Sequence, residues 1–441
     1  MEEAKTIYSR LVKPQFQDSF ARLFPELNDY IGDNKEKMVV KNITFVTTEQ
    51  CQLRCTYCYQ CDKKSNFMSI EIAKKAIDAL FDKEKMNGYI TDYNKCAIIE
   101  FIGGEPLLNM DAVEFICEYF VYKAAELNHP WYKYHMFSFT SNGINFKTER
   151  VQRWLNRYRN RISIGITIDG DKSLHDSCRL FPDGKGSYDI VVESVKDGIA
   201  NFGLNSSKVT FAPENISKIN IAIPHLIELG LTDIHANCVY ENVWKDEHAP
   251  IFFNELIKLA DYFIDKEIYK HAYCSIFDES IGHPMEPSDN KNWCGGTGDM
   301  LAIAPDGRFF PCIRYMQYSL TKSKEQPIGD VDTKILSLEE SPFLLEMSKI
   351  TRRSQSTDEC FNCSVASGCS LCSAYNYDIN GTANKRCTYI CKMHKARVAA
   401  NYYYWNRLYK KLNLNDKFEM HLSKEDLKLV TGGNENVLSN L

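Results

Sequence analysis

Cysteine spacing constrains this chain more than any other feature of its sequence. The 441 residues include 17 cysteines, of which four lie within residues 51–61 and eight within residues 294–391. The chain does not open with a positive cluster and an apolar run, and no later segment approaches the ~20 apolar residues of a membrane span. We therefore expect a cytoplasmic protein. Because cytoplasmic thiols stay reduced, so many cysteines indicate metal or cluster binding rather than disulfides.

The composition excludes several classes of protein and partner. Hydrophobic residues make up 44% of the chain and charged residues 25%, as in ordinary globular proteins and unlike disordered, collagen-like or coiled-coil chains. The 53 basic and 58 acidic residues leave a net charge of -5. No basic excess favours nucleic acid and no polybasic run favours a lipid surface, so we expect neither partner.

Between the two cysteine groups, short β-branched or aromatic runs alternate with longer segments of helical period. This alternation predicts an α/β fold in which crossover helices connect parallel strands. Apolar residues at three- and four-residue intervals predict one helix after Ser69 and another over residues 113–124. The predicted strands are residues 43–48, 97–102, 134–140, 162–168, 207–211 and 233–239.

Polar or glycine-rich turns follow these predicted strands. They are the loop that begins at Cys51, Gly103-Gly104-Glu105-Pro106, Ser141-Asn142-Gly143, Asp169-Gly170, residues 213–215 and residues 240–241. The carboxyl ends of parallel strands meet at one edge of a sheet, which is where a βα barrel places its active site. The sequence therefore predicts a functional site at this edge.

The first cysteine group has the spacing Cys51-x-x-x-Cys55-x-x-Cys58. Three thiolates on one short loop suit a four-iron cluster and leave one iron without a protein ligand. Structural zinc prefers four ligands, usually as paired Cys-x-x-Cys knuckles, so zinc or buried thiols are the weaker alternative. Cys61 makes a further Cys-x-x-Cys pair with Cys58, and we interpret it as a non-ligand because three ligands suffice.

With the aromatic Tyr57 before its third cysteine, this motif resembles the signature of the radical S-adenosyl-L-methionine (SAM) superfamily. The resemblance implies a partial (β/α)6, TIM-like barrel in which Cys51, Cys55 and Cys58 hold a [4Fe-4S] cluster. It also implies that the open iron binds the amino and carboxylate groups of SAM and that Tyr57 lies near the adenine. The expected cofactors of the barrel are therefore SAM and one cluster.

Further segments match elements of the same superfamily. Gly103-Gly104-Glu105-Pro106 resembles its GGEP element, which implies that this backbone and Glu105 hold the methionine amino group. Ser141 and Asn142 match the segment near the ribose, and Arg179 matches an arginine that approaches the carboxylate in related enzymes. Taken alone, Asn142 is equally a turn former and Arg179 a solvated charge. Their order along the chain favours the cofactor site.

The second cysteine group resembles the SPASM domain, which carries two auxiliary [4Fe-4S] clusters in radical SAM enzymes that modify peptides and proteins. By this resemblance the cysteines fall into an outer set and an inner set: Cys360, Cys363, Cys369 and Cys391 form the outer set, and Cys294, Cys312 and Cys372 the inner set. The family usually has three residues, not two, between the ligands that match Cys369 and Cys372. A double zinc ribbon also uses Cys-x-x-Cys pairs and is the alternative.

The inner set has only three cysteines. Relatives with a fully ligated inner cluster carry another one within the segment that matches residues 295–311, and this chain has none there. An iron with a vacant position can bind a substrate thiolate, because soft sulfur suits iron. Cys387 is the alternative ligand that would fill the vacancy. The other cysteines are interpreted as small buried hydrophobic residues: Cys96, Cys117, Cys178, Cys238 and Cys274.

These resemblances cover residues 40–400 and together imply a radical SAM peptide maturase with a SPASM domain, an oxidoreductase-type enzyme with three [4Fe-4S] clusters. The implied reaction uses a 5'-deoxyadenosyl radical that takes a hydrogen atom from a Cys-rich, ribosomally made precursor peptide. Capture of the resulting carbon radical by a thiolate held on the inner cluster, with the excess electron leaving through the clusters, would form a thioether crosslink. The implied partners are this peptide and an external electron donor such as flavodoxin or ferredoxin.

Two other functions stay open. A sulfatase-maturing relative would oxidise a Cys or Ser of a protein to formylglycine, with Asp299 as the candidate base. A surface aspartate is an equal interpretation of Asp299. A structural or redox-sensing module would bind clusters or zinc without catalysis. Product analysis separates the two enzymes, whereas iron content and adenosyl release separate both of them from the third function.

The sequence divides into four expected segments. They are an N-terminal extension (1–40), the radical SAM barrel (41–285), the SPASM domain (286–400) and a C-terminal helix with a tail (401–441). The end of this tail, residues 422–433, resembles the end of a double-glycine leader peptide. Ser423 and Asp426 make a near capping box for a short helix there. An ordinary terminal helix that stops at glycine is the alternative.

Overall fold

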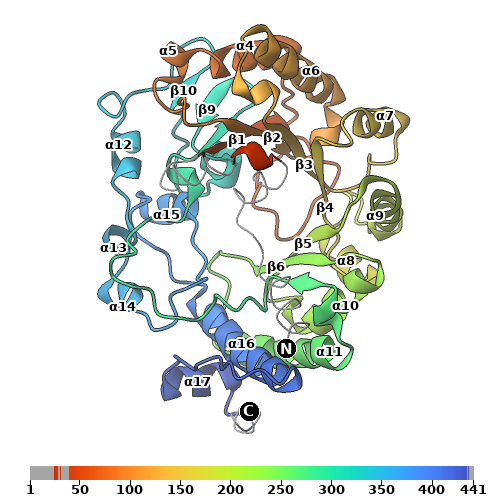
Figure 1. Cartoon of the computed structure of the whole chain (residues 1–441), viewed down its shortest axis with the longest axis vertical. Coiled ribbons are helices and arrows are strands. Elements are labelled where there is room, and N and C mark those ends of the chain that lie inside the picture. The colour runs from red at the N-terminus through yellow and green to blue at the C-terminus, as the bar shows by residue number, and fades with distance from the viewer. Residues whose placement is uncertain (1–23, 28–29, 31–38, 435, 437–441) are drawn as a thin grey trace.

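The computed structural model describes residues 24–27, 30, 39–434 and 436. Most of the expected N-terminal extension lies outside these residues. Figure 1 shows an arc of strands with helices on its outer side and the cysteine-rich segment opposite its inner side. All six predicted strands are confirmed: β1 (Val40–Thr48), β2 (Cys96–Gly103), β3 (His135–Ser141), β4 (Ile162–Ile166), β5 (Ser206–Phe211) and β6 (Asp233–Cys238).

The arc is a partial barrel made of two sheets. Strands β1 to β4 are parallel neighbours in one sheet, and β5, β6 and β7 (Tyr273–Cys274) are parallel neighbours in the other. Between β4 and β5 the Ser207 hydroxyl donates to the Ile166 carbonyl at 3.0 Å, which joins the two sheets through a side chain. The predicted α/β class with a partial barrel is therefore confirmed.

The cysteine-rich segment extends the first sheet. Strand β8 (Met300–Ile303) runs parallel to β1, with Met300 opposite Asn42 and Ile303 opposite Phe45. Strands β9 (Arg308–Phe310) and β10 (Gly329–Asp330) follow as antiparallel neighbours, so the order is β10-β9-β8-β1-β2-β3-β4. The sheet thus contains residues from both sides of the boundary expected between residues 285 and 286.

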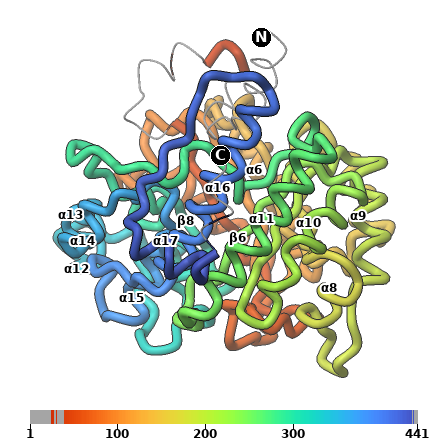
Figure 2. The backbone as a smooth tube through the Cα atoms, turned by 90° about the horizontal axis from the view of Figure 1, so that it is seen from below, coloured from red at the N-terminus to blue at the C-terminus, as the bar shows by residue number. Residues whose placement is uncertain are grey.

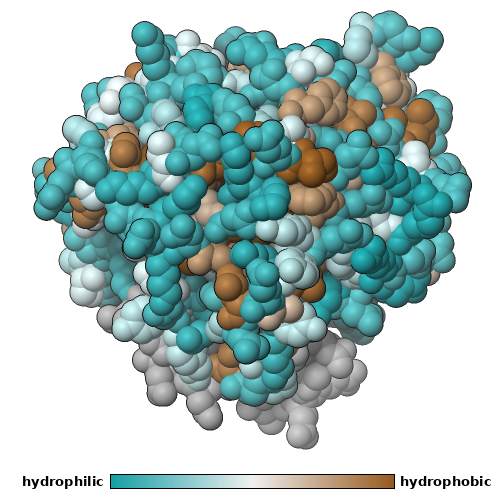
Figure 3. Space-filling model, turned by 90° about the horizontal axis from the view of Figure 1, so that it is seen from above, coloured by the Kyte–Doolittle hydropathy of each residue, from teal (hydrophilic) through white to brown (hydrophobic). Residues whose placement is uncertain are grey.

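Helices cover the outer face of the arc. The helix predicted after Ser69 is α4, and Ser69 caps it because its hydroxyl accepts the Ile72 amide at 3.1 Å. The end of the molecule that carries α4 to α7 is mostly hydrophilic, with small apolar patches (Figure 3). The outer helices are α4 (Ile70–Leu80), α5 (Lys83–Met86), α6 (Met110–Glu126), α7 (Glu149–Arg157), α8 (Lys172–Cys178), α9 (Tyr188–Phe202), α10 (Ile219–Glu228) and α11 (His248–Asp265).

The two faces of the arc differ in polarity because successive strand residues point to opposite sides. Phe45, Phe101 and Phe137 point outward and are fully buried against the helices. Thr44 and Glu100 lie on the inner face, where the Thr44 hydroxyl donates to the Glu100 carboxylate at 2.8 Å. Branched apolar side chains fill a closed βα barrel. Here the inner face borders a cavity of about 450 Å³, lined by Thr140, Thr167, Lys208 and His235 among others.

The C-terminal half of the chain returns to the barrel through one long helix. Helix α16 packs along α11 (Figure 2), and the ring of Tyr404 stacks on that of Phe277 with 4.3 Å between centroids. Within the described residues no helix is both long and apolar enough to cross a membrane. The helices of this half are α12 (Pro342–Ser348), α13 (Arg352–Gln355), α14 (Asp358–Phe361), α15 (Ser373–Asn380), α16 (Cys391–Lys411) and α17 (Lys424–Thr431).

Candidate functional site

The first cysteine group lies in the loop after β1, at the carboxyl edge of the sheet. Cys51 is buried, and Cys55 and Cys58 are half-buried. Burial raises the pKa of the Cys55 thiol to about 11, Arg179 opposes this rise and the neighbouring Cys58 sulfur adds to it. The Asn142 side-chain amide donates to Cys51 Sγ at 3.6 Å. The structure therefore brings the three cysteines together on one loop, beside two of the other predicted residues.

The two glycines of the β2 turn allow that turn to lie against the Cys51 loop. A Cβ atom on Gly104 would lie 2.1 Å from the Gln50 carbonyl oxygen, and one on Gly103 would lie 2.2 Å from the Thr48 carbonyl oxygen. The space is used by two backbone hydrogen bonds of 2.9 Å, from the Gly104 amide to Thr48 and from the Glu105 amide to Gln50. Only glycine fits this close approach of two backbones.

Glu105 is the carboxylate at the centre of the carboxyl edge. It is buried and accepts hydrogen bonds from the Ser141 hydroxyl at 2.8 Å, the Asn142 amide at 2.7 Å and the Leu107 amide at 3.1 Å. Burial raises its pKa to about 6, and the three donors oppose this rise. Pro106 follows it and begins a short 3-10 helix, Pro106–Leu108. The predicted GGEP turn and the Ser141-Asn142 turn therefore meet at one carboxylate.

A second polar group lies on the other side of the Cys51 loop. The Tyr57 hydroxyl donates to the Asp169 carboxylate, and Arg179 Nη1 donates to the Tyr57 oxygen at 2.9 Å. Asp169 and Arg179 are buried, and burial raises the pKa of Asp169, with Arg179 and Tyr57 acting against it. Among the described residues, Asp169 Oδ1 and Arg179 Nε have no hydrogen-bond partner. Because buried polar atoms are normally paired, these two indicate a polar ligand in this space.

Asp169 is a site residue that the sequence reasoning did not single out. The available signal was its position directly after the fourth predicted strand, in the Asp169-Gly170 turn. Its contacts with Tyr57 and Arg179 show its place only in the folded chain. The Glu105 carboxylate can bind an amino group, and the Arg179 guanidinium can bind a carboxylate. These two residues therefore fit the amino-acid part of SAM.

The cysteine-rich segment folds so that its cysteines form two groups. Burial raises the pKa of Cys369 to about 11, and the sulfurs of the other three members of the outer set act in the same direction. Burial also raises the pKa of Cys312, and the other two members of the inner set add to it. The two groups match the outer and inner sets in membership, although the sets interleave in the sequence.

Close packing at Gly296 orients the inner set. A Cβ atom there would lie 3.1 Å from Cys312 Sγ and 3.6 Å from Cys294 Sγ, so both sulfurs face this glycine. In the part of the chain that the structure describes, no three Cys, His, Asp or Glu side chains form a group that could hold a single metal ion. A four-iron cluster takes its cysteines at separate iron corners, so its ligands stand farther apart than those of one ion.

Cys387, the alternative fourth ligand, lies beside the inner set. Burial raises the pKa of its thiol, and the neighbouring Cys372 sulfur adds to this rise. The Asn380 side-chain amide donates to Cys387 Sγ at 3.4 Å, and this hydrogen bond lowers the pKa of the thiol. Cys387 therefore already has a polar partner of its own, and both ligand assignments for the inner set remain predictions.

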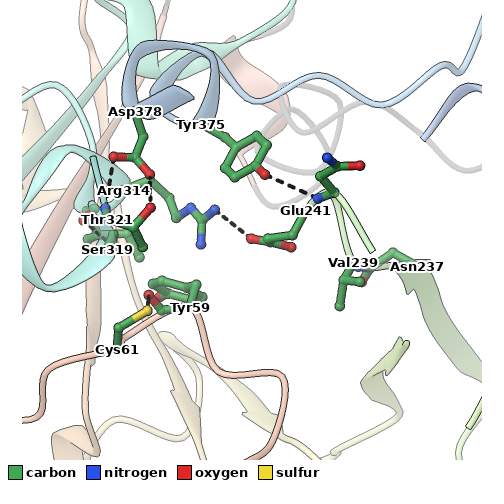
Figure 4. Close-up of polar contacts among 12 residues, drawn as sticks. Tyr59, Cys61, Asn237, Val239, Glu241, Arg314, Ser319, Thr321, Tyr375 and Asp378 are labelled. Atoms are coloured by element: carbon green, nitrogen blue, oxygen red, sulfur yellow. Dashed lines mark hydrogen bonds and ion pairs between the residues drawn. The ribbon is translucent and has the colours of Figure 1, made fainter. Parts of the chain in front are cut away.

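A pocket of about 250 Å³ lies between the Cys51 loop and the cysteine-rich segment. In Figure 4, Arg314 points toward Glu241, and its Nη2 donates to that carboxylate at 3.0 Å. The guanidinium carbon lies 4.6 Å from the centroid of the Tyr59 ring. Burial raises the pKa of Cys372, and Arg314 lowers it. Arg314 thus links the Cys51 loop, the turn after β6 and the inner set at the wall of this pocket.

Cys61 and Asp299 differ in their position relative to this pocket. Cys61 is exposed and lines the pocket, and its amide donates to the Tyr318 carbonyl at 2.9 Å. Asp299 precedes β8, whose Met300 lies opposite Asn42 near the start of β1. The Cys51 loop follows the other end of β1, so Asp299 lies at the opposite edge of the sheet. Its candidate role as a base at this site is therefore not supported.

Comparison with protein families and curated proteins agrees with the site. Residues 45–211 match the model of the radical SAM superfamily. The chain is 26% identical over 293 residues to the radical SAM cyclopropyl synthase TigE of Paramaledivibacter caminithermalis. The aligned region covers 62% of this chain and 57% of TigE. It is 29% identical over 171 residues to the antilisterial bacteriocin subtilosin biosynthesis protein AlbA of Bacillus subtilis, covering 37% of this chain and 32% of AlbA. The chain thus spans little more than half of TigE.

The chain is also similar to a third relative and to two solved structures. The cysteine-type anaerobic sulfatase-maturating enzyme of Clostridium novyi is 26% identical over 159 residues, covering 34% of this chain and 37% of the enzyme. Native anSMEcpe with bound AdoMet and Cp18Cys peptide has a TM-score of 0.59 at 15% identity, covering 85% of this chain and 99% of that one. Streptococcus suis SuiB bound to precursor peptide SuiA has a TM-score of 0.52 at 12% identity, covering 83% and 80%. Residues 45–211 therefore match the radical SAM superfamily, which is a superfamily of enzymes, and the chain has a fold like those of anSMEcpe and SuiB.

Proposed function

We propose that this protein is a cytoplasmic radical SAM maturase that forms thioether crosslinks in a Cys-rich, ribosomally made peptide. The main support is the pocket between the Cys51 loop and Arg314, which lies beside the inner set. A peptide bound there would contact both sites at once. Thioether formation needs this, because a carbon atom and a sulfur atom of the peptide must be held together. The open inner face of the arc gives such a peptide room.

The cofactor assignments follow the sequence predictions. Cys51, Cys55 and Cys58 would hold one [4Fe-4S] cluster, and the outer and inner sets would hold two more. When bound, the first cluster and SAM supply the radical that removes a hydrogen atom from the peptide. An external electron donor such as flavodoxin or ferredoxin would supply the electron for each SAM cleavage.

The chain's own residues would bind and orient SAM. In its ionised form Glu105 would accept hydrogen bonds from the SAM ammonium, while Arg179 would donate to its carboxylate. Asp169 is fully buried and accepts a hydrogen bond from the Tyr57 hydroxyl, so it would hold the Tyr57 ring in place beside SAM. Ser141 and Asn142 would fix the Glu105 carboxylate and thereby the position of the ammonium.

Similarity to other proteins supports a peptide as the substrate. The name of AlbA assigns it to the biosynthesis of the bacteriocin subtilosin. The solved structures of anSMEcpe and SuiB contain a Cp18Cys peptide and the precursor peptide SuiA, respectively. A fold shared with both proteins is compatible with a peptide that enters between the barrel and the cysteine-rich segment.

Mass spectrometry of the product tests the proposal. The reconstituted enzyme is incubated without oxygen with SAM, a reductant and a Cys-rich peptide. A thioether keeps the sulfur and removes two hydrogen atoms per crosslink, and the modified cysteine no longer reacts with iodoacetamide. The variant Arg314→Gln should lose most crosslinking but keep SAM cleavage. Arg308→Gln, at an arginine paired with Asp306 and Glu325, is the matched control and should crosslink normally. A product that has lost its cysteine sulfur would contradict thioether formation.

The second candidate function is formylglycine formation on a protein substrate. The similarity to a sulfatase-maturating enzyme in sequence and to anSMEcpe in fold supports it. Asp299 lies at the other edge of the sheet, so the base for this reaction would have to come from another residue. Glu241, which lines the pocket and pairs with Arg314, is the candidate. Loss of sulfur from the product, abolished by Glu241→Gln, would identify this function.

A further inference from the structure

The C-terminal helix α17 packs against both α11 and α16 (Figure 2). Val430 and Thr431 are buried and Leu427 is half-buried, whereas Leu429 is 42% exposed. The Ser423 hydroxyl accepts the Asp426 amide at 3.0 Å, which confirms Ser423 as the cap, whereas the Asp426 carboxylate pairs with Lys395. The helix therefore docks through residues spaced three apart on a surface formed by α11 and α16, which we call the groove.

Polar contacts fix the direction in which the tail enters the groove. Lys395 of α16 pairs with Asp426 at 2.6 Å, and their side chains are 18% and 27% exposed. Just before the helix, the Ser364 hydroxyl donates to the His421 carbonyl at 2.5 Å. Ser364 directly follows Cys363 of the outer set. The tail thus enters the groove next to the outer set.

The double glycine ends the helix at the other end of the groove. Gly432 and Gly433 have φ values of +61° and +83°, in the left-handed region that favours glycine. A Cβ atom on Gly432 would lie 3.1 Å from Cβ of Pro250, in the first turn of α11. Helix α11 follows the turn after β6, which holds Glu241 and lines the pocket. A chain that leaves Gly433 therefore starts at the end of α11 that is nearest in sequence to the pocket wall.

We propose that the groove between α11 and α16 is the docking site for the helical leader of the substrate peptide, and that α17 occupies it until that peptide binds. The identity of the partner rests on the proposed function. The leader that fits has the features by which α17 docks: apolar residues three apart, an acidic residue directly before the first of them, and a double glycine after the helix. Docked in this direction, the residue after the double glycine leaves along α11, as in the tail itself, where the Asn434 side-chain amide donates to the Asn254 side chain at 3.5 Å.

The contacts of α17 make it replaceable. Helices shorter than about twelve residues are marginal on their own in water, so α17 holds its structure mainly through the groove. Among the described residues, the buried Thr431 hydroxyl has no hydrogen-bond partner, so the tail is an imperfect occupant. A leader with valine at the position of Thr431 has a side chain of the same shape but lacks the unpaired hydroxyl. We expect it to bind about tenfold more tightly than the tail sequence.

Hydrogen exchange of the full-length, reconstituted protein tests this proposal. The probes are synthetic peptides of residues 420–434 with the native sequence, with Thr431→Val, and with Asp426→Lys. An attached tail competes at a millimolar effective concentration, so about 1 mM native peptide should expose roughly half of the α17 amides. The Thr431→Val peptide should do so near 0.1 mM, because of its about tenfold gain. The Asp426→Lys peptide should leave α17 protected. Continued protection of α17 against the native and Thr431→Val peptides would show an integral terminal helix and overturn the proposal.

Two further measurements check the contacts and the direction. The chain variant Lys395→Glu should reverse the preference and exchange its tail for the Asp426→Lys peptide. A photoreactive phenylalanine analogue placed directly after the double glycine of the Thr431→Val peptide should crosslink to the first two turns of α11, near Pro250 and Asn254. Crosslinks confined to the region of the outer set would contradict the direction of docking. Neither readout needs turnover, so an enzyme that fails to crosslink cysteines but exchanges its tail would refute the proposed function and not the groove.

Discussion

The pKa of Glu105 gives a quantitative test of the site. Burial raises this pKa from an ordinary 4.5 to about 6, against the pull of three hydrogen-bond donors. Between these two pH values the folded state binds a proton more tightly than the unfolded state. The free energy of unfolding therefore falls as pH rises through this window. At about 1.4 kcal/mol per pH unit, the loss is about 2 kcal/mol, complete above pH ~6 and absent below pH ~4.5.

The variant Glu105→Gln cannot ionise, so it should lack this contribution. Urea unfolding of both proteins is measured from pH 4.5 to 7.5 without cofactors. The wild-type free energy of unfolding, minus that of the variant, should fall by about 2 kcal/mol across this range. Other titrating groups are shared by the two proteins and cancel in the difference. Because the SAM ammonium would bind the ionised carboxylate, the affinity of the wild type for SAM should also weaken as pH falls below about 6.

Glu126→Gln is the matched control, because Glu126 is exposed and pairs with Lys123 at the end of α6. This substitution should leave the pH dependence nearly unchanged. Parallel curves for the wild type and Glu105→Gln would refute the reasoning. They would mean that the Ser141 and Asn142 donors compensate the burial of the carboxylate in full.

Three other changes test other parts of the structure. Replacing the three cysteines of the Cys51 loop by alanine should lower the iron content from about twelve to about eight per chain and abolish SAM cleavage; cleavage at the wild-type rate would disprove the assignment. Gly104→Ala should destabilise the protein by about 3 kcal/mol or more in urea unfolding, since its Cβ would overlap the Gln50 carbonyl, whereas Gly184→Ala, which has open space but a positive φ, should cost about 1 kcal/mol. A thiol-containing peptide should change the paramagnetic spectrum of the inner cluster and an all-serine peptide should not; a response that appears only in Cys387→Ala would show that Cys387 closes the site in the wild type.

Periodicity and spacing predicted the parts of the fold that have local signals. The six strands of the arc and helices α4 and α6 follow from alternating or three- and four-residue apolar patterns, which the chain carries over whole segments. The Cys51 loop and the Gly103-Gly104 turn follow from motifs with fixed spacing. The clash that a Cβ at Gly104 would cause gives this motif its physical reason.

Other features depend on contacts between distant residues. The two- to four-residue strands β8, β9 and β10 are too short for any period, and β8 is defined by its pairing with β1. An aspartate in a turn is ordinary in sequence, so Asp169 gains its meaning only from burial beside Arg179. Asp299 was a candidate base because it follows Cys294 closely in sequence. Its distance along the chain could not predict that it lies at the edge of the sheet opposite the Cys51 loop.

The pairing of β1 with β8 has a consequence for how the chain is made. On the ribosome, β2 can pair with β1 early, but the other edge of β1 has no partner until Met300 emerges. An unpaired edge of a central strand is a template for association with other chains. A nascent or proteolysed chain that ends near residue 285 would expose this edge along Asn42 to Phe45. The cysteine-rich segment therefore covers an edge of the barrel, and we expect a barrel made without it to associate with other chains through β1.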